Sequence, residues 1–119
     1  MERTRADKFD DLIAWQKARE LTRAIYQATS AGSFAKDFGL RDQVRRASVS
    51  VMSNLAEGIE RGGRAEFYQF LSVAKSSCAA LRSQLHVALD AAHVNPPTFR
   101  QLIHQAEEVA RIIVGLRKA

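Results

Sequence analysis

A row of polar side chains along one predicted helix is the set of residues best placed to do chemistry. Its members recur every three or four positions, so that each lies about one helical turn from the next and can contact it. We call this set the polar row; it consists of Gln43, Arg46, Ser50, Asn54, Glu57 and Arg61. If the row faces another helix, every polar group in it needs a partner, because an unpartnered buried polar group costs about 1–3 kcal/mol. Under burial, Arg46 and Glu57 are expected to form an ion pair.

Three interpretations of the polar row compete. It could be a structural network that fixes helix register or subunit contacts, a nucleic-acid or ligand surface, or a solvated flank. We favour the structural network, because the row adjoins apolar positions on both sides. A catalytic role for Glu57 alone is the weakest of the interpretations.

Enzyme and metal signatures are absent from the sequence. There is no Gly-rich phosphate loop, no Ser or Cys nucleophile motif and no pair of cysteines for zinc. His104 with Glu107 has the reverse order of a di-iron motif and stands alone, and His86 with His93 has no third ligand. We therefore expect no catalytic residue, no cofactor and no metal.

Length and composition predict one soluble domain covering 1–119. No apolar run approaches the ~20 residues needed to cross a bilayer. The first eight residues are mostly charged and resemble neither a signal peptide nor an anchor. The lone Cys78 lies at core spacing and is expected to be a buried thiol in a reducing compartment. These features favour a cytoplasmic location.

The apolar periodicity predicts an all-α fold. Four helices are expected at about 11–31, 40–59, 65–93 and 98–117, and the third should be the longest. Because short connections join helices of similar length, neighbours should be antiparallel, which predicts an up-down-up-down four-helix bundle.

Particular residues should mark the helix ends. Asp10 or Asp11 could cap the first helix, and Gly32 should end it. Gly58 with the glycine pair that follows should end the second helix. The two phenylalanines at 34 and 38 are expected to cover one end of the bundle. After the proline pair at 96–97, Thr98 and Gln101 resemble a capping box.

The second predicted helix is apolar on most of its circumference, which indicates burial on more than one side. One ridge should serve the bundle core and comprises Leu40, Val44, Ala47, Val51 and Leu55. A second face should meet a neighbouring subunit and comprises Val49, Met52, Ala56 and Ile59.

Over residues 43–58 the pattern Gln-x-x-Arg-Ala-Ser-x-Ser-x-x-Ser-Asn-x-Ala-Glu-Gly resembles the bacterial family of proteins encoded in intervening sequences of 23S ribosomal RNA genes. The resemblance extends to further positions in the neighbouring helices: Leu12, Trp15, Ala18, Leu21, Arg61, Glu66, Phe67, Phe70, Leu71 and Ala74. It implies a cytoplasmic four-helix bundle that assembles into a homopentamer, with a link to ribosomal RNA or the ribosome. The pattern is also similar to that of a related bundle, the accessory protein of diversity-generating retroelements, which looks like a basic pentamer that binds nucleic acid and a reverse transcriptase. No catalytic residues come with the family.

The net charge of +5 and a pI near 9.9 permit binding to a polyanion, although Arg and Lys are mostly interleaved with acidic residues. Together with the resemblance, this predicts a non-enzymatic, homopentameric module that binds RNA or a ribonucleoprotein without reading sequence. The residues expected to contact phosphates are Arg41, Arg45, Arg61, Arg64, Arg111, Arg117 and Lys118. The alternative is a protein-binding scaffold with no nucleic-acid role.

Overall fold

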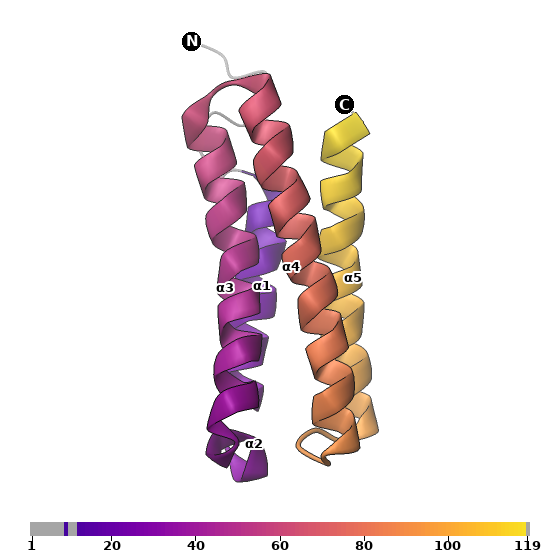
Figure 1. Cartoon of the computed structure of the whole chain (residues 1–119). Helices are drawn as coiled ribbons and strands as arrows, with labels where there is room; N and C mark the ends of the chain where they lie inside the picture. Colours follow the sequence, from indigo (N-terminus) through magenta and orange to yellow (C-terminus); the bar gives the residue numbers. More distant parts are fainter. Residues whose placement is uncertain (1–8, 10–11, 119) are drawn as a thin grey trace.

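The structure consists of helices and short connections (Figure 1). The computed structural model describes residue 9 and residues 12–118. Its helices are α1 (Ile13–Ala28), α2 (Gly32–Lys36), α3 (Phe38–Arg61), α4 (Arg64–Asp90) and α5 (Pro96–Lys118). None of these described residues belongs to a strand, so the predicted all-α class is confirmed. With 27 residues, α4 is the longest helix, as predicted.

The four long helices run alternately in opposite directions (Figure 1). The most extensive packing joins α3 to α4, while α1 contacts α3 and α5, and α5 also contacts α4. Each long helix therefore has two neighbours around a common core, in the predicted antiparallel bundle. The short α2 packs against α3 at the end of the bundle opposite the start of α1 and the last turn of α5. No described helix is both long enough and apolar enough to cross a membrane.

The core is formed by one stripe from each long helix, because residues three and four apart lie on the same face. The stripes comprise Ala14, Ala18, Leu21 and Ile25 in α1; Val44, Ser48, Val51, Leu55 and Gly58 in α3; Leu71, Ala74, Cys78, Leu81, Leu85 and Ala88 in α4; and Leu102, Ala106, Val109 and Ile113 in α5. Of the predicted α3 ridge, Leu40 and Ala47 are only half-buried. Ser48 is also buried, and its hydroxyl is satisfied because it donates to the Arg45 carbonyl at 2.9 Å.

Gly58 does not end a helix, contrary to the sequence-based prediction. It lies inside α3 and is buried against α4. A Cβ built at Gly58 would stand 3.0 Å from Phe70 Cβ and 3.1 Å from Phe67 Cδ1. The glycine thus permits the close approach of α3 and α4. Gly62 is the residue that ends α3, in the left-handed conformation with φ +77°.

The first helix is shorter than predicted and a separate helix follows it. Leu12 occupies the N-cap position of α1 without a side-chain hydrogen bond, and Asp10 and Asp11 lie outside the described residues. The helix ends at Ala28, where the Thr29 hydroxyl donates to the Ile25 carbonyl at 2.7 Å. Gly32 begins α2 with φ +64°, so it starts a new helix after a turn and does not end the preceding one.

Only one of the two phenylalanines in this connection covers the core. Phe34 in α2 is 1% exposed and packs in the core, as predicted. Phe38 is 64% exposed, and the Arg41 guanidinium lies 4.8 Å from the centroid of its ring. The prediction for Phe38 is wrong because Asp37 caps α3, accepting from the Leu40 amide at 3.2 Å, and Phe38 begins the helix on its solvent side.

The connection between α4 and α5 also differs from prediction. α4 ends at Asp90, before the predicted limit of 93, and Ala92 adopts φ +60°. The His93 amide donates to the Ala88 carbonyl at 2.9 Å and the Ala92 amide to the Leu89 carbonyl at 3.0 Å, which is a Schellman ending. The cap of α5 is Asn95, whose Oδ1 accepts from the Thr98 amide at 2.9 Å. The predicted capping box of Thr98 and Gln101 is therefore wrong.

Candidate interaction surfaces

The middle of the polar row joins α3 to α4. The Ser50 hydroxyl lies 2.8 Å from the Ser77 hydroxyl of α4. Asn54 Nδ2 donates to the Ser50 carbonyl at 2.8 Å and to the Ser50 hydroxyl at 3.1 Å. All three side chains are half-buried. This part of the row has the character of a structural network, because each bond is made within or between packed helices.

The far end of the row forms an exposed ion-pair cluster at the α3–α4 turn. Arg61 lies 3.2 Å from the Glu57 carboxylate and 3.6 Å from that of Glu66. Its guanidinium also lies 5.5 Å from the centroid of the Phe70 ring. Since all three charged side chains are about half exposed, each pair contributes little to stability.

The beginning of the row is exposed to solvent. Gln43 and Arg46 make no hydrogen bond or ion pair with the residues that the structure describes. Arg46 and Glu57 do not form the expected pair, since they lie eleven positions apart on the helix, about 16 Å along the axis. The polar row therefore divides into a structural middle, an exposed ion-pair cluster and a solvated start.

The predicted subunit face of α3 is partly covered by the bundle itself. Met52 and Ile59 are half-buried and pack against the core, and Ala56 is half-buried. On the same flank, Arg45 reaches α1, donating to Thr29 Oγ1 at 2.8 Å. Val49 is 39% exposed. A contact of this face with a second subunit stays a prediction.

Two of the predicted phosphate-binding residues are engaged within the chain near α2. Arg41 pairs with Asp42 at 3.0 Å and donates to the Ala35 carbonyl at 3.1 Å. Arg45, besides its bond to Thr29, lies 4.5 Å from the centroid of the Tyr26 ring. Both guanidinium groups therefore stabilise the local fold, and binding an external phosphate would require them to give up these contacts.

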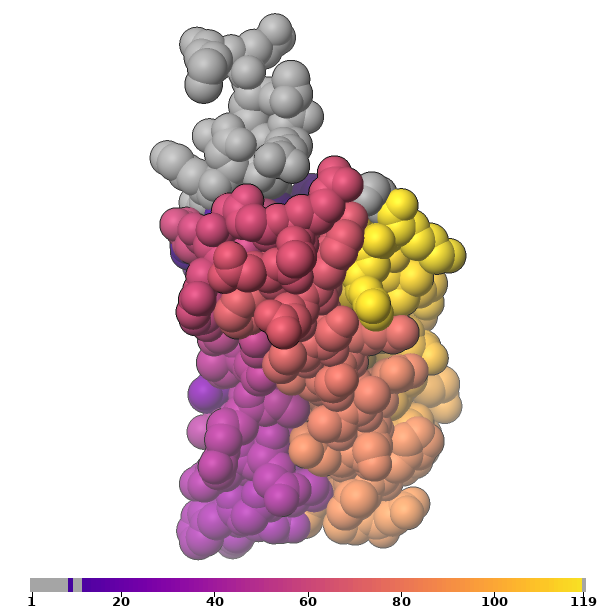
Figure 2. Space-filling model, turned by 45° about the horizontal axis from the view of Figure 1, so that its top comes forward, coloured from indigo at the N-terminus to yellow at the C-terminus, as the bar shows by residue number. Residues whose placement is uncertain are grey.

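The remaining predicted cations gather toward the opposite end of the bundle. Arg61 lies twenty residues beyond Arg41 on α3, about 30 Å along the axis. Figure 2 shows the α3–α4 turn, which contains Arg61 and Arg64, on the same end of the molecule as the last turn of α5. That turn contains Arg117 and Lys118. The predicted basic residues therefore divide between two ends and do not form one continuous surface.

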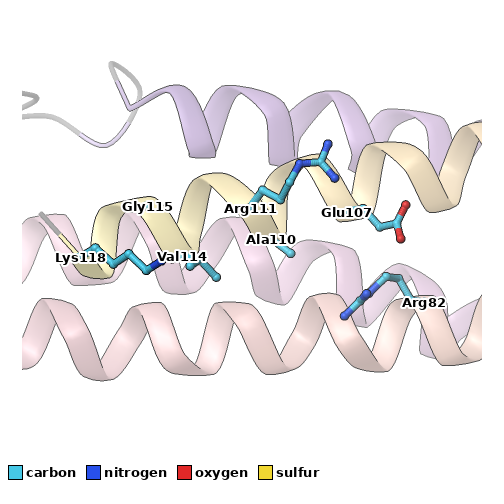
Figure 3. Close-up of a pocket in the computed structure, with 7 residues that line it drawn as sticks. All are labelled: Arg82, Glu107, Ala110, Arg111, Val114, Gly115 and Lys118. Atoms are coloured by element: carbon cyan, nitrogen blue, oxygen red, sulfur yellow. The ribbon is translucent and has the colours of Figure 1, made fainter.

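An open groove of about 510 Å³ runs between α4 and α5. Its lining comprises Arg82 from α4 and, from α5, Glu107, Ala110, Arg111, Val114, Gly115 and Lys118 (Figure 3). Arg111 and Lys118 are among the cations predicted from the sequence, whereas Arg82 is not. No pattern could have identified Arg82, because it stands alone between Leu81 and Ser83 and meets the other cations only when α5 packs on α4.

The side chains in this groove leave positive charge unpaired. Arg82, Arg111 and Lys118 form no ion pair with any residue in the described part of the chain. The Arg82 Nε atom is buried and donates no hydrogen bond to those residues. Glu107 is the single carboxylate in the lining. The groove thus presents three cations against one anion.

His93 lies in a hydrogen-bonded cluster at the α2 end. Its Nδ1 is 2.7 Å from the Ser33 hydroxyl, its Nε2 is 3.0 Å from the Asp37 carboxylate, and its ring stacks on Phe34 with centroids 5.1 Å apart. The hydrogen bond from His93, with that from the Leu40 amide, lowers the pKa of Asp37. Within residues 9 and 12–118, no three His, Cys, Asp or Glu side chains are grouped so that they could hold a metal ion.

Cys78 is buried in the α4 stripe, as predicted. Burial raises the pKa of its thiol to about 11, although the positive charge of Arg82 acts in the opposite direction. The thiol is therefore protonated at neutral pH and has the character of a small core side chain.

Comparison with known proteins relates the chain to a described family. The family model described as 23S rRNA-intervening sequence protein matches residues 10–115. The fold is similar to a crystal structure of a protein with unknown function from the S23 ribosomal protein family of Bacteroides thetaiotaomicron, with 17% identity and a TM-score of 0.81. That similarity covers 90% of this chain and 100% of the other, and at this identity it concerns the fold alone. None of the curated proteins matches this chain.

Proposed function

Because this chain belongs to the 23S rRNA-intervening sequence protein family, we propose that it is a non-enzymatic, oligomeric interaction module that binds RNA or a ribonucleoprotein. In this proposal the module works in the cytoplasm, assembles as a homopentamer and requires no cofactor. The family description and the name of the Bacteroides protein both refer to ribosomal components, which supports RNA or the ribosome as the partner.

The observation that carries the proposal is the set of unpaired cations on α4 and α5. Arg64, Arg82, Arg111, Arg117 and Lys118 form no ion pair with the described residues. Such side chains can neutralise phosphates without first breaking an internal pair. The proposed contacts are to the backbone, so binding should depend on salt and not on base sequence.

A titration of purified protein with structured RNA and with duplex DNA at low salt tests this function. The proposal predicts binding to RNA that weakens as salt is added. If neither nucleic acid binds at low salt, the proposal is wrong. Light scattering across micromolar concentrations tests the oligomer separately, because a monomer throughout that range would contradict the homopentamer.

The second candidate function is a protein-binding scaffold without a nucleic-acid role. The exposed face of α4 favours it, because Val73 and Val87 are 48% and 53% exposed and the positions between them on this face are uncharged: Ser76, Ala80 and Ser83. Such a face suits packing against another protein surface. Capture of a protein partner by wild type, with loss on Val73→Lys or Val87→Lys and no affinity for RNA, would favour the scaffold.

A further inference from the structure

We infer that the groove between α4 and α5 binds the phosphodiester backbone of an RNA strand, with Arg82 as the central contact. This inference rests on the proposed function and assigns it to one site. It also removes Arg41, Arg45 and Arg61 from the binding surface, since each is already engaged by neighbouring groups.

Arg82 is held ready to bind an anion. Its side chain is half-buried, and its Nε has no hydrogen-bond acceptor among the described residues. A buried donor without an acceptor is costly. Because this Nε has almost no accessible surface, an external phosphate would contact the terminal N–H groups of the guanidinium, and a charge-assisted hydrogen bond there would offset part of that cost. The planar guanidinium can offer two parallel N–H groups to one phosphate, which a lysine cannot do.

The other cations extend the site along α5. In Figure 3 the Arg82 and Lys118 side chains extend toward the groove from opposite ends, with Val114 between them, and Arg111 lies across the outer side of α5. Arg111 and Lys118 are two helical turns apart, about 10 Å along the axis. Charges repeated over this length suit a chain of phosphates better than one isolated anion.

The lining contains no aromatic side chain. Ala110, Val114 and Gly115 form the apolar part, and no aromatic ring is among the lining residues on which a base could stack. Sequence-tolerant binding to single strands normally combines a basic groove with such rings. This groove should therefore contact the backbone only, and uridine and cytidine homopolymers should bind with similar affinity.

Gly115 offers a test that leaves the fold intact. A Cβ built there meets no atom within 4 Å, so a side chain at this position extends into open space at the groove. Glu and Gln are both better helix formers than Gly. Gly115→Glu places a carboxylate beside the cations, and Gly115→Gln is the matched neutral control of nearly the same size.

Removal of one cation supplies a second, independent pair of variants. Arg82→Gln removes a charge from the groove. Arg100→Gln removes an equal charge from an exposed position in the first turns of α5, near the opposite end of the helix. If affinity for RNA depended only on net charge, both variants would lose the same affinity. If the groove is the binding site, Arg82→Gln should lose more affinity than Arg100→Gln.

The experiment measures anisotropy of fluorescein-labelled oligouridine with each variant, after circular dichroism and light scattering have established native helicity and mass. Gly115→Glu should bind about tenfold or more weakly than Gly115→Gln. Arg82→Gln should bind several-fold more weakly than Arg100→Gln, with a salt slope reduced by about 0.7. If wild type binds and both members of each pair bind alike, the groove assignment is wrong and the proposed function stands. If wild type does not bind oligouridine, the groove assignment is wrong, and the titration with structured RNA and duplex DNA decides the proposed function separately.

Discussion

His93 Nε2 lies 3.0 Å from Asp37 Oδ2, which joins the α4–α5 connection to the start of α3 across the end of the bundle. The same carboxyl group caps α3 through the Leu40 amide, and the other ring nitrogen contacts Ser33 in α2. One imidazole thus connects α2 and the start of α3 to a connection that lies 56 residues further along the chain. We interpret this cluster as a structural contact, in which the Asp37 carboxylate both caps α3 and binds His93.

Asp37→Asn should lower the melting temperature near neutral pH. Asn can still cap α3, so the variant removes mainly the charged contact with His93. Because folding lowers the pKa of Asp37, the contribution of its carboxylate is fully present above the unfolded value of 3.8 and is lost as pH falls through the lower folded value. The difference in melting temperature between wild type and variant should therefore shrink below pH 3.8. A difference in melting temperature that stays constant as pH falls below 3.8 would contradict a stabilising role for the Asp37 carboxylate.

Gly58→Ala should destabilise the protein although Ala is the better helix former. The new Cβ would stand 3.0 Å from Phe70 Cβ, which forces α3 and α4 apart or distorts the rings. Overpacking of this kind costs about 1–3 kcal/mol in the free energy of unfolding. Gly115→Ala is the control, since its Cβ meets nothing within 4 Å and should raise stability by about 0.5–1 kcal/mol. Urea denaturation measures the free energy of unfolding of both variants. Equal changes in the two variants would contradict the close packing of α3 and α4 at Gly58.

Asn54→Leu should reduce stability or disturb assembly before it affects any binding. It removes the hydrogen bonds to Ser50 in the half-buried network with Ser77, at a cost of about 1 kcal/mol. Glu57→Ala should act in the same direction but with a smaller effect, about 0.5 kcal/mol or less, because its pair with Arg61 is exposed. Thermal melts and light scattering check both variants. Normal stability and mass combined with lost RNA binding would show that the polar row is a functional surface.

Ala92→Gly should stabilise the protein by about 1 kcal/mol. Ala92 has φ +60° in the Schellman ending of α4, a conformation that strains any residue with a Cβ and that glycine adopts freely. Ala91→Gly, one position earlier with φ −79°, is the control and should lower stability or leave it unchanged. A midpoint of chemical denaturation that falls in Ala92→Gly would show that the turn is not strained.

Cys78 should resist alkylation in the folded protein. Its thiol is buried and its pKa is raised to about 11, so little thiolate exists near neutral pH. Iodoacetamide should modify the native protein slowly and the urea-unfolded protein completely, as measured by mass spectrometry. Rapid modification of the native protein would indicate that α4 opens or that the thiol is accessible.

The long helices could be predicted because their apolar residues recur over many turns. The same reasoning failed at α2, whose five residues are too few to show a period. It also failed at Gly58, because a glycine that permits close packing and a glycine that ends a helix look alike in one sequence. Only the crossing of α3 against Phe67 and Phe70 distinguishes the two roles.

The candidate groove was less predictable than the fold. Arg111 and Lys118 could be selected as cations, but Arg82 belongs to another helix and meets them only through the packing of α4 on α5. Conversely, Arg41 and Arg45 were expected to bind phosphate, and their partners Ala35, Thr29 and Tyr26 are brought to them by the turn between α1 and α3. Charge can be counted in a sequence, whereas its pairing depends on the tertiary structure.

The salt dependence of RNA binding by the wild-type protein tests the central claim most directly. A titration of labelled RNA at increasing salt concentration should give a linear fall of log affinity with log salt. For single-stranded RNA held by the three groove cations, we predict a slope of about −2 from each subunit site. Undetectable binding at low salt, or an affinity that does not change with salt, would contradict the account.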